Sequence, residues 1–447
     1  RRTVPGRAKP EVETVFLYEY SISKMKRKRS ALTSQAPPAQ VLPLVSIIIP
    51  VHNGLVPVAT PPSASTSADA ELASSSETWL DACLSSVLRQ TYDGPLEVSI
   101  FDDASDDGSG AAIRAWGARL QEAGVSVALS GSRWAATTQP ARKDVAAAAA
   151  PAGGIGVAKN RAVQQSSGEY LCFLDVDDVL LSSRVARQLA ASRAHPRAIV
   201  GGGFVREPRD STAHHAAWAN GMSPAQLWLQ QFRETTVLMP TWFMPRSLYD
   251  AVGGFREAPP HSGEAEDLRF FHAHLDLHGA ENVAAGVPSL IRVGDAASPL
   301  LLYRWSTDSG TSRVTRRQLI AIRAAAFERR ILDKAWAGRR FSVWGAGRDA
   351  KHFIAALSVA SRARIAVLLE IAPKKIGTTY VNGSLTPPVK IPIVHFKEAA
   401  KGGAAVHGGA VVVCVSLRRG SEQQGGALET NVATLGLVEG ESLWYFN

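Results

Sequence analysis

The sequence predicts an α/β protein in which a larger unit with a largely parallel sheet is followed by a smaller α/β unit. Three observations support this: short apolar runs rich in β-branched residues, amphipathic segments of helical spacing between them, and a second alternation of the same kind near the C-terminus. Strands that alternate with helices are typical of parallel sheets covered by helices. With 447 residues, 45% of them hydrophobic, the chain is long enough for two or three domains.

The strands and helices of the larger unit follow in order. Residues 44–51 read LVSIIIPV, a nearly continuous apolar run that is typical of a strand buried on both faces. Residues 77–90 predict a helix, because apolar side chains recur at i, i+3, i+4, i+7 and i+8, from Leu80 to Leu88. The alternation continues with strand 96–101, helix 110–123, strand 125–129, helix 156–166 and strand 169–174.

The smaller unit, residues 338–447, is expected to be a Rossmann-like domain. It opens with RRFSVWGAGRDAKHFIAAL, which reads as a strand, a glycine turn and an amphipathic helix, and further strands are predicted at 364–370 and 411–415. Gly345 and Gly347 match the first two glycines of a G-x-G-x-x-G motif.

This glycine motif is weak evidence for a bound dinucleotide. Ala350 takes the place of the third glycine, and Glu370 ends the next strand, where a ribose-binding acid could lie. Because a lone motif is weak, a packing or RNA-facing role is favoured over dinucleotide binding.

Charge and low-complexity segments suggest where the chain is not folded. The net charge is +9 and the pI about 9.6, which fits an anionic partner such as nucleic acid or simply a solvated basic surface, the latter favoured on charge alone. Residues 1–43, with the basic run KMKRKR, are expected to be disordered, and those before Met25 are not necessarily translated. Residues 55–77 and 130–153, rich in Ala, Ser, Thr and Pro, predict flexible insertions.

Cysteine usage and hydropathy indicate a cytoplasmic protein. Cys83, Cys172 and Cys414 lie in apolar contexts without a CxxC pair, so neither a disulfide framework nor a structural zinc site is indicated. No stretch approaches the roughly 18 apolar residues of a membrane span, and the N-terminal residues lack the apolar core of a signal peptide.

Acidic residues gather where two predicted strands end, the edge at which open α/β sheets place their ligands. Asp102 and Asp103 follow one strand, and Asp175, Asp177 and Asp178 follow another. Carboxylates this close either share a proton or neutralise a divalent cation, and oxygen ligands suit Mg²⁺ or Mn²⁺. A diphosphate would complete the coordination of such a cation.

Five motifs follow one another between residues 44 and 310: VSIIIPVHNG, DDASDDGS, GVAKNRAVQQSSGEYLCFLDVDDVL, GGFRE and EAEDLRFF. In this order they resemble the family 2 glycosyltransferases of the GT-A fold, and five ordered motifs are far more specific than any one of them. The resemblance implies a GT-A nucleotide-sugar-binding domain at residues 44–337, followed by the Rossmann-like domain. It also implies an inverting, metal-dependent hexosyltransferase that uses a UDP-sugar.

The resemblance assigns several residues to the nucleotide. Pro50 and His52 would border the uridine, and Asp103 would hydrogen-bond the uracil ring. Lys159 stands where many relatives have arginine, which implies a cation that faces the base or the diphosphate. Arg161 is a rival for that role.

The LDVDD run resembles the family's D-x-D motif. Asp175 would then contact the ribose and Asp177 would ligate the metal that bridges the diphosphate. Residues 302–313 resemble the family's closing loop, in which Arg304 would meet the diphosphate. Trp305 replaces the histidine that more often follows this arginine, so the role of the loop stays open.

On the acceptor side, the resemblance makes Asp267 of the ED motif the general base that removes the proton of the acceptor hydroxyl. Glu266 is expected on the acceptor side as well, whereas Glu264 fits a favourable charge at a helix N-terminus. Trp242 and Gly254 would lie near the acceptor, although an isolated tryptophan is as readily a core residue.

The C-terminal run from FSVWGAGRDAKHFIAAL to LWYFN is similar to that of eukaryotic queuosine-tRNA galactosyltransferases. This resemblance implies transfer of galactose from UDP-galactose to queuosine at the anticodon wobble position of a cytosolic tRNA. One alternative is a cytosolic UDP-sugar-dependent transferase of N-acetylglucosamine or glucose that acts on a glycan, protein or small molecule. Another is a binding protein with an inert transferase domain, against which the complete set of acidic motifs argues.

Overall fold

The computed structural model describes residues 41–58, 77–134, 151–260, 262–306, 314–415 and 427–446. The predicted N-terminal basic segment and most of the two predicted insertions lie outside the described residues. The ends of the first insertion are described, and they pair with each other through a bridge between Pro57 and Thr78. The second insertion begins later than predicted, because Ser130 and Gly131 still belong to a strand.

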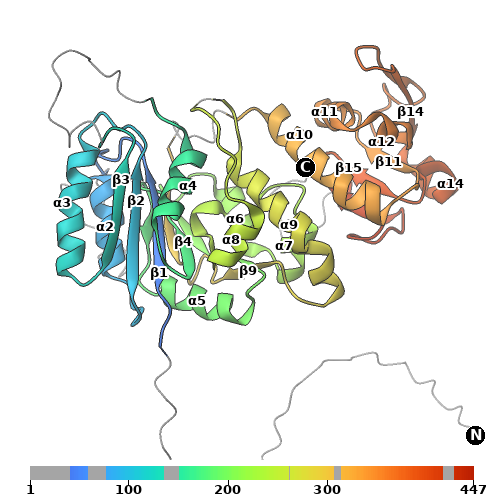
Figure 1. Ribbon diagram of the computed structural model, residues 1–447. Helices are drawn as coiled ribbons and strands as arrows, with labels where there is room; N and C mark the ends of the chain where they lie inside the picture. The colour runs from blue at the N-terminus through green and yellow to red at the C-terminus, as the bar shows by residue number, and fades with distance from the viewer. Residues whose placement is uncertain are drawn as a thin grey trace, which may run out of the picture. The chain divides into compact units, whose positions relative to one another are not determined.

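A seven-stranded sheet in the order β3-β2-β1-β4-β8-β6-β9 forms the centre of the larger part (Figure 1). Its strands are β1 Val45–Val51, β2 Leu96–Asp102, β3 Ser126–Gly131, β4 Tyr170–Phe173, β6 Ile199–Gly202, β8 Phe243–Pro245 and β9 Leu290–Val293. Every residue of β1 is buried, as its apolar run predicted. The four strands predicted for this unit are confirmed to within about two residues at each end.

The sheet is largely parallel, as predicted, but one strand, β8, runs in the opposite direction. β1 is parallel to β2 and β4, and β2 is parallel to β3, whereas β8 runs antiparallel to both β4 and β6. β8 has only three residues and follows a 3-10 turn, Met239–Thr241, instead of a crossover helix. The direction of a strand depends on how the chain returns to the sheet, which side-chain periodicity does not encode.

Helices cover both faces of this sheet, with α2 and α3 on one face and α4 on the other in Figure 1. The helices of the larger part are α2 Trp79–Leu88, α3 Ser109–Glu122, α4 Ile155–Gln165, α5 Arg184–Ala194, α6 Ala213–Gly221, α7 Pro224–Leu229, α8 Arg246–Val252 and α9 Glu266–Ala284. Thr78 begins α2 through a capping box with Asp81, and the predicted stripe is buried except for Leu88, which is 40% exposed.

A second, three-stranded sheet in the order β5-β10-β7 was not predicted. It consists of β5 Val179–Leu180, β7 Phe204–Glu207 and β10 Leu301–Arg304. β5 follows the acidic turn directly, and the register pairs Arg304 of β10 with Glu207 of β7. The sheet therefore brings an arginine from late in the chain next to the acidic residues.

The C-terminal part contains the second α/β unit that the sequence predicted. Its six-stranded sheet has the order β13-β14-β12-β11-β15-β16, in which only β13 is antiparallel to its neighbour within the described residues. The strands are β11 Phe341–Trp344, β12 Ile365–Glu370, β13 Thr379–Asn382, β14 Val389–His395, β15 Val411–Val413 and β16 Leu443–Tyr445. The helices are α10 Arg316–Phe327, the π-helix η4 Glu328–Ala335, α11 Arg348–Ala356, α12 Val359–Ala363, α13 Phe396–Gly402, α14 Ala404–His407 and α15 Ala427–Ala433.

The glycine turn of this unit is tight, and the carboxylate of Glu370, which ends the next strand, has hydrogen-bond partners within the protein. Gly345 has a φ of 113°, a conformation that L side chains rarely adopt. The carboxylate of Glu370 accepts a hydrogen bond from Lys375 Nζ at 2.9 Å and others from the backbone amides of Ile371 and Ala372. These contacts give Glu370 a structural role in its own turn, in line with the packing or RNA-facing role favoured for the motif over dinucleotide binding.

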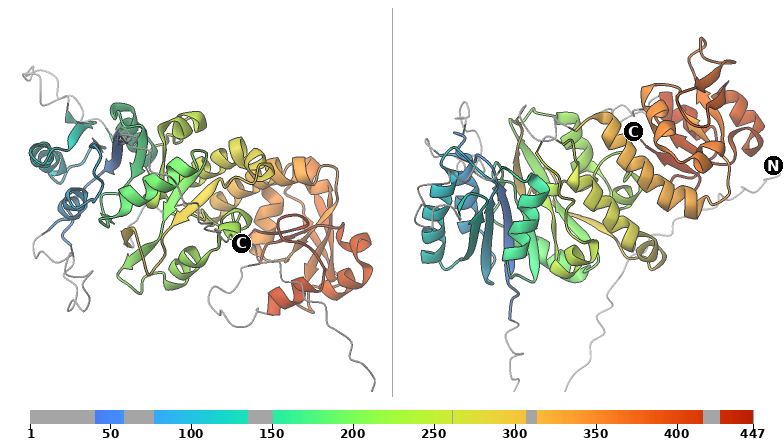
Figure 2. Two further views of the ribbon diagram at one scale, coloured as in Figure 1. Left: turned by 90° about the horizontal axis from the view of Figure 1, so that it is seen from below. Right: turned by 45° about the horizontal axis from the view of Figure 1, so that its top comes forward.

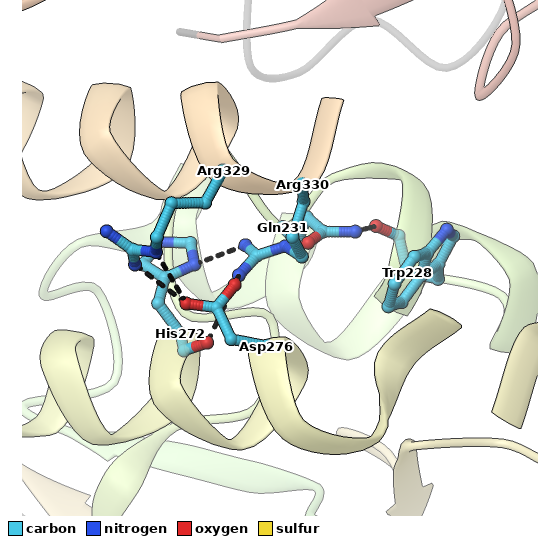
Figure 3. Close-up of polar contacts among 6 residues, drawn as sticks. All are labelled: Trp228, Gln231, His272, Asp276, Arg329 and Arg330. Carbon is cyan, nitrogen blue, oxygen red and sulfur yellow. Dashed lines mark hydrogen bonds and ion pairs between the residues drawn. The ribbon is translucent and has the colours of Figure 1, made fainter. Parts of the chain in front are cut away.

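Polar contacts of the buried Arg330 and the exposed Arg329 join the π-helix η4 to helix α9 (Figure 3). Arg330 donates to Asp276 Oδ1 at 2.5 Å and to His272 Nδ1 at 2.7 Å, while Arg329 donates to Asp276 Oδ2 at 2.7 Å. Burial lowers the pKa of Arg330 to about 10, with Asp276 opposing the shift, and burial together with the nearby arginines holds the pKa of His272 well below its usual range. His272 is therefore neutral, and its Nδ1 accepts a hydrogen bond from Arg330.

Phe232 of the larger part belongs to the hydrophobic core of the C-terminal part. Phe232 packs edge-on against Phe327 of α10 and against Trp444 of β16, with ring centroids 5.0 and 5.3 Å apart. In both views of Figure 2 the helices α10 and η4 (orange) lie beside α9 (yellow), in agreement with the ion pairs between η4 and Asp276. Among the described residues, no helix is both long and apolar enough to cross a membrane.

Candidate active site

Three carboxylates lie on the turn between β4 and β5, as the sequence predicted. One oxygen from each of Asp175, Asp177 and Asp178 lies within 4.8 Å of the others. Asp175 Oδ1 and Asp178 Oδ2 are buried and have no hydrogen-bond partner among the described residues. Buried acceptors without donors are costly, and a cation bound by all three side chains would satisfy them.

The electrostatics of this acidic cluster, Asp175, Asp177 and Asp178, fit a divalent cation. Burial, and then the neighbouring Asp175, raises the pKa of Asp177 to about 7, with Arg304 opposing. Burial also raises the pKa of Asp175, and it raises that of Asp178 well above the usual range. A bound Mg²⁺ or Mn²⁺ would reverse these shifts, and carboxylate oxygens are the ligands that both ions prefer.

Arg304 lies beside the acidic cluster but is held by the protein. Its Nε donates to Glu207 Oε2 at 2.6 Å, its Nη1 to the carbonyl of Asp177 at 2.9 Å, and its backbone amide to Asp178 Oδ1 at 3.0 Å. The side chain is only 8% exposed. Arg304 thus orders the acidic turn in this structure, and the predicted loop beyond Ser306 lies outside the described residues.

The residues expected at the uridine meet where β1 and β2 end. Pro50 is buried within β1, and the exposed His52 has its Nδ1 2.8 Å from the carbonyl oxygen of Asp103. The carboxylate of Asp103 accepts hydrogen bonds from the backbone amides of Gly153 and Gly154 at 2.7 and 2.8 Å. Asp103 therefore fixes the chain that enters α4.

Helix α4 also contacts the segment that leads into α9. Lys159 Nζ lies 2.7 Å from Glu266 Oε1, and its side chain is only 2% exposed. The side chain of Asn160 binds both the amide and the carbonyl of Phe255, at 2.9 and 2.8 Å. A Cβ at Gly156 would lie 2.3 Å from the carbonyl oxygen of Arg256, so only glycine allows this approach.

Asp267 follows Glu266 in the first turn of α9 and is partly exposed. Burial, and then the neighbouring Glu266, raises the pKa of Asp267 to about 7, while Lys159 and a hydrogen bond from the amide of Leu268 oppose the shift. A carboxylate with this proton affinity suits general-base chemistry near neutral pH. The helix stripe predicted here is confirmed, because Leu268, Phe271 and Leu275 are buried.

The sequence of residues 73–253 matches the family "Glycosyl transferase family 2". This part of the chain therefore resembles glycosyl transferase family 2. This match includes Asp103, Lys159 and the acidic cluster, and it ends before Asp267.

Individual relatives share little sequence identity with this chain. The uncharacterized glycosyltransferase EpsJ of Bacillus subtilis (strain 168) is 23% identical over 211 residues, which are 47% of this chain and 48% of EpsJ. The match thus spans about half the length of this curated relative.

Among solved structures, S. aureus TarS 1–349 in complex with UDP-GlcNAc is similar with 15% identity and a TM-score of 0.40, over 65% of this chain and 68% of TarS. The mannosyltransferase PcManGT from Pyrobaculum calidifontis, in complex with GDP-Man and Mn²⁺, has 19% identity and a TM-score of 0.35, over 65% of this chain and 67% of its own.

Trp242 is a core residue, so the structure favours the core alternative for it over the expected contact with an acceptor. Its side chain is fully buried, and its Nε1 donates to the carbonyl of Val237 at 2.9 Å. The indole stacks on Phe255 and packs against Phe270, with centroids 6.3 and 5.6 Å away. A tryptophan whose ring and N–H are both satisfied internally offers no face to a sugar.

Gly254 is required by the backbone. Its φ is 79°, and a Cβ there would lie 3.1 Å from Tyr249 Oη and 3.2 Å from Asn160 Oδ1. Glycine at this position thus lets the preceding segment approach α4, and a contact with an acceptor stays a prediction.

Sequence reasoning missed two charged residues in the segment that resembles family 2. Arg184 is fully buried in α5 and donates to the carbonyls of Phe173 and Pro240, at 2.7 and 2.8 Å, below the acidic turn. Glu207 binds Arg304 across two strands. The only local signal was Gln188, four residues after Arg184 on the same helix and bonded to it at 2.9 Å.

Proposed function

We propose that this protein is an inverting, metal-dependent glycosyltransferase that uses a nucleoside-diphosphate sugar. The observation that supports it most directly is the acidic cluster at the edge of the sheet, in which two buried oxygens have no hydrogen-bond partner within the described part of the chain. Asp177 would ligate the cation, with the carboxylates of Asp175 and Asp178 close by. When bound, the cation would stabilise the negative charge of the departing nucleoside diphosphate.

The protein's own groups supply the rest of the proposed reaction. Asp267 removes the proton of the acceptor hydroxyl, whose oxygen attacks the anomeric carbon from the face opposite the leaving group. One displacement of this kind inverts the anomeric configuration. Asp103 and His52 form the uridine end of the site, and Asp175 the ribose end.

The electrostatics connect these two ends. The positive charge of Lys159 acts on Asp175 at the donor end and on Asp267 at the acceptor end. Charges interact noticeably only over short distances inside a protein. Both carboxylates therefore lie near one buried cation, which supports their assignment to one transfer site.

For the substrates, we propose galactose transfer from UDP-galactose to queuosine at the wobble position of a cytosolic tRNA. Two features support this: the net charge of +9, and the resemblance of the C-terminal run to β-1,3-N-acetylglucosaminyltransferase-like protein 1, identified as a queuosine-tRNA galactosyltransferase. A UDP-sugar-dependent transfer to a glycan, protein or small molecule is the alternative, which needs the same carboxylates but no basic docking surface.

The deciding experiment incubates the protein with Mn²⁺ and radiolabelled UDP-galactose, UDP-glucose or UDP-N-acetylglucosamine. Total tRNA with queuosine and total tRNA from queuosine-free cells serve as matched acceptors, and nucleosides are analysed by mass. We expect label from UDP-galactose only in the queuosine nucleoside, and weaker tRNA binding as salt rises, with a slope of about −0.7 per phosphate contact. Equal turnover with both tRNA pools would exclude queuosine as the acceptor, and salt-independent binding would contradict a tRNA acceptor. Neither result would exclude the transferase.

A further inference from the structure

Lys159 is a buried cation at the candidate site, although the resemblance assigned it to the donor. Its ammonium is engaged by Glu266 Oε1 at 2.7 Å and lies 5.2 Å from the centre of the Phe255 ring. A side chain that is 2% exposed, with its charge already paired, is poorly placed to reach a diphosphate. Its partner is the residue directly before Asp267.

The surroundings of Lys159 show what this ion pair holds in place. The neighbouring Asn160 binds the backbone of Phe255 and accepts a hydrogen bond from Tyr249 Oη at 2.6 Å. Gly156, one turn earlier, lies against the carbonyl of Arg256. One face of α4 therefore contacts Tyr249, Phe255 and Arg256 as well as the start of α9. Among the described residues, the ion pair between Lys159 and Glu266 is the one that joins α4 to the ED pair.

We propose that Lys159 is a positioning residue for the candidate base: its ammonium binds Glu266 and so fixes the first turn of α9, on which Asp267 lies, instead of binding the nucleotide-sugar. This inference rests on the proposed function. It reassigns the cation of the sequence motif from the donor to the acceptor side.

The charges around Asp267 come from three elements and act in known directions. Glu266, its neighbour on α9, and Glu234, from the segment after α7, favour the protonated form of Asp267, whereas Lys159 on α4 favours the ionised form. Asp175 also faces Lys159, and Arg184 faces Asp175. Loss of the Lys159 charge should therefore raise the pKa of Asp267, and loss of the Glu266 charge should lower it.

The test uses Lys159→Met, Lys159→Arg and Glu266→Gln in the full chain, with UDP-galactose, Mn²⁺ and total tRNA. UDP release is measured from pH 5.5 to 8.5 with and without tRNA, and UDP-galactose affinity is measured by calorimetry. We expect Lys159→Met to lower the rate about 10- to 100-fold and to move the acidic limb of the pH profile upward, with donor affinity nearly unchanged. Lys159→Arg keeps the charge, so its acidic limb should lie close to that of the unmodified protein. Glu266→Gln should move the acidic limb to lower pH.

Gln164→Met is the matched control, because Gln164 lies on the same helix and is exposed. It should leave the acidic limb where it is. A tenfold loss of donor affinity in Lys159→Met with an unmoved acidic limb would show that Lys159 serves the donor, and the inference would be wrong. If Lys159→Met fails to fold, Glu266→Gln provides the test, and an acidic limb of its pH profile that does not move would contradict the inference. Absence of any UDP-sugar turnover in the unmodified protein would instead refute the proposed function itself.

Discussion

The carboxylate of Asp103 accepts a hydrogen bond from the backbone amide of Gly154 at 2.8 Å, although 51 residues separate them. Gly154 has a φ of 99°, and a Cβ there would lie 2.3 Å from the carbonyl oxygen of Ala258. The start of α4 is thus held between the end of β2 and the segment before α9. A residue that the sequence assigned to the uracil therefore also shapes the site.

Replacing Asp103 should affect stability as well as the donor. Asp103→Ala leaves the amides of Gly153 and Gly154 without their acceptor, which should lower the free energy of unfolding by about 1–3 kcal/mol. UDP-galactose affinity should fall in parallel. Urea unfolding and calorimetry measure the two effects, and Asp106→Ala, an exposed carboxylate in the same run, is the control. Unchanged stability in Asp103→Ala would contradict the structural role.

The acidic cluster should bind a divalent cation through Asp177. In Asp177→Asn, which keeps the size of the side chain but removes its charge, Mn²⁺ should no longer raise the melting temperature, and transfer should be abolished. Melting curves with and without Mn²⁺, and with EDTA, measure this. Asp106→Asn should respond to Mn²⁺ like the unmodified protein. Near-normal turnover in Asp177→Asn would exclude it as a ligand.

The candidate base should act only on the acceptor. Asp267→Asn keeps the shape of the side chain but cannot take up a proton, so transfer should fall by about 100-fold or more. UDP-galactose affinity in the presence of Mn²⁺ should be nearly unchanged. Glu264→Gln, two residues before the same helix, should retain most of the transfer. If Asp267→Asn loses donor affinity as severely as Asp103→Ala, Asp267 belongs to the donor pocket and Glu266 becomes the better candidate.

The pH dependence of transfer should report the Asp267 carboxyl group. Burial, and then Glu266, raises its pKa to about 7, and a base works only when deprotonated. The rate should therefore rise through about pH 7 and level off above it. Initial rates at saturating UDP-galactose measure this profile. A rate that is flat from pH 5.5 to 8 would mean that Asp267 is ionised throughout or is not the base.

The contacts in Figure 3 should contribute substantially to stability. Asp276→Ala leaves the buried Arg330 without its carboxylate partner, which should lower the free energy of unfolding by about 3–5 kcal/mol. Asp333→Ala removes an exposed carboxylate from the same π-helix and is the control. Urea unfolding measures both variants. An equal, small effect of the two substitutions would show that the Arg330 pair does not hold α9.

Local patterns in the sequence determined the elements that end at the site. The apolar run of β1, the helical stripe of α2 and the acidic turn after β4 were all predictable, because backbone geometry repeats every two or 3.6 residues and the side chains follow it. The five ordered motifs then indicated the family, and the structure confirmed a second α/β unit near the C-terminus.

Only the tertiary structure decided what the charged residues touch. Lys159 binds Glu266 across 107 residues, and Arg304 binds Glu207 across 97. Trp242, an equally good candidate for core or surface in the sequence, is in the core. The direction of β8 and these long-range pairs depend on how the chain returns to the sheet, and no local period records that path. Burial then sets the proton affinities of Asp177 and Asp267, because desolvation depends on the neighbours that folding supplies.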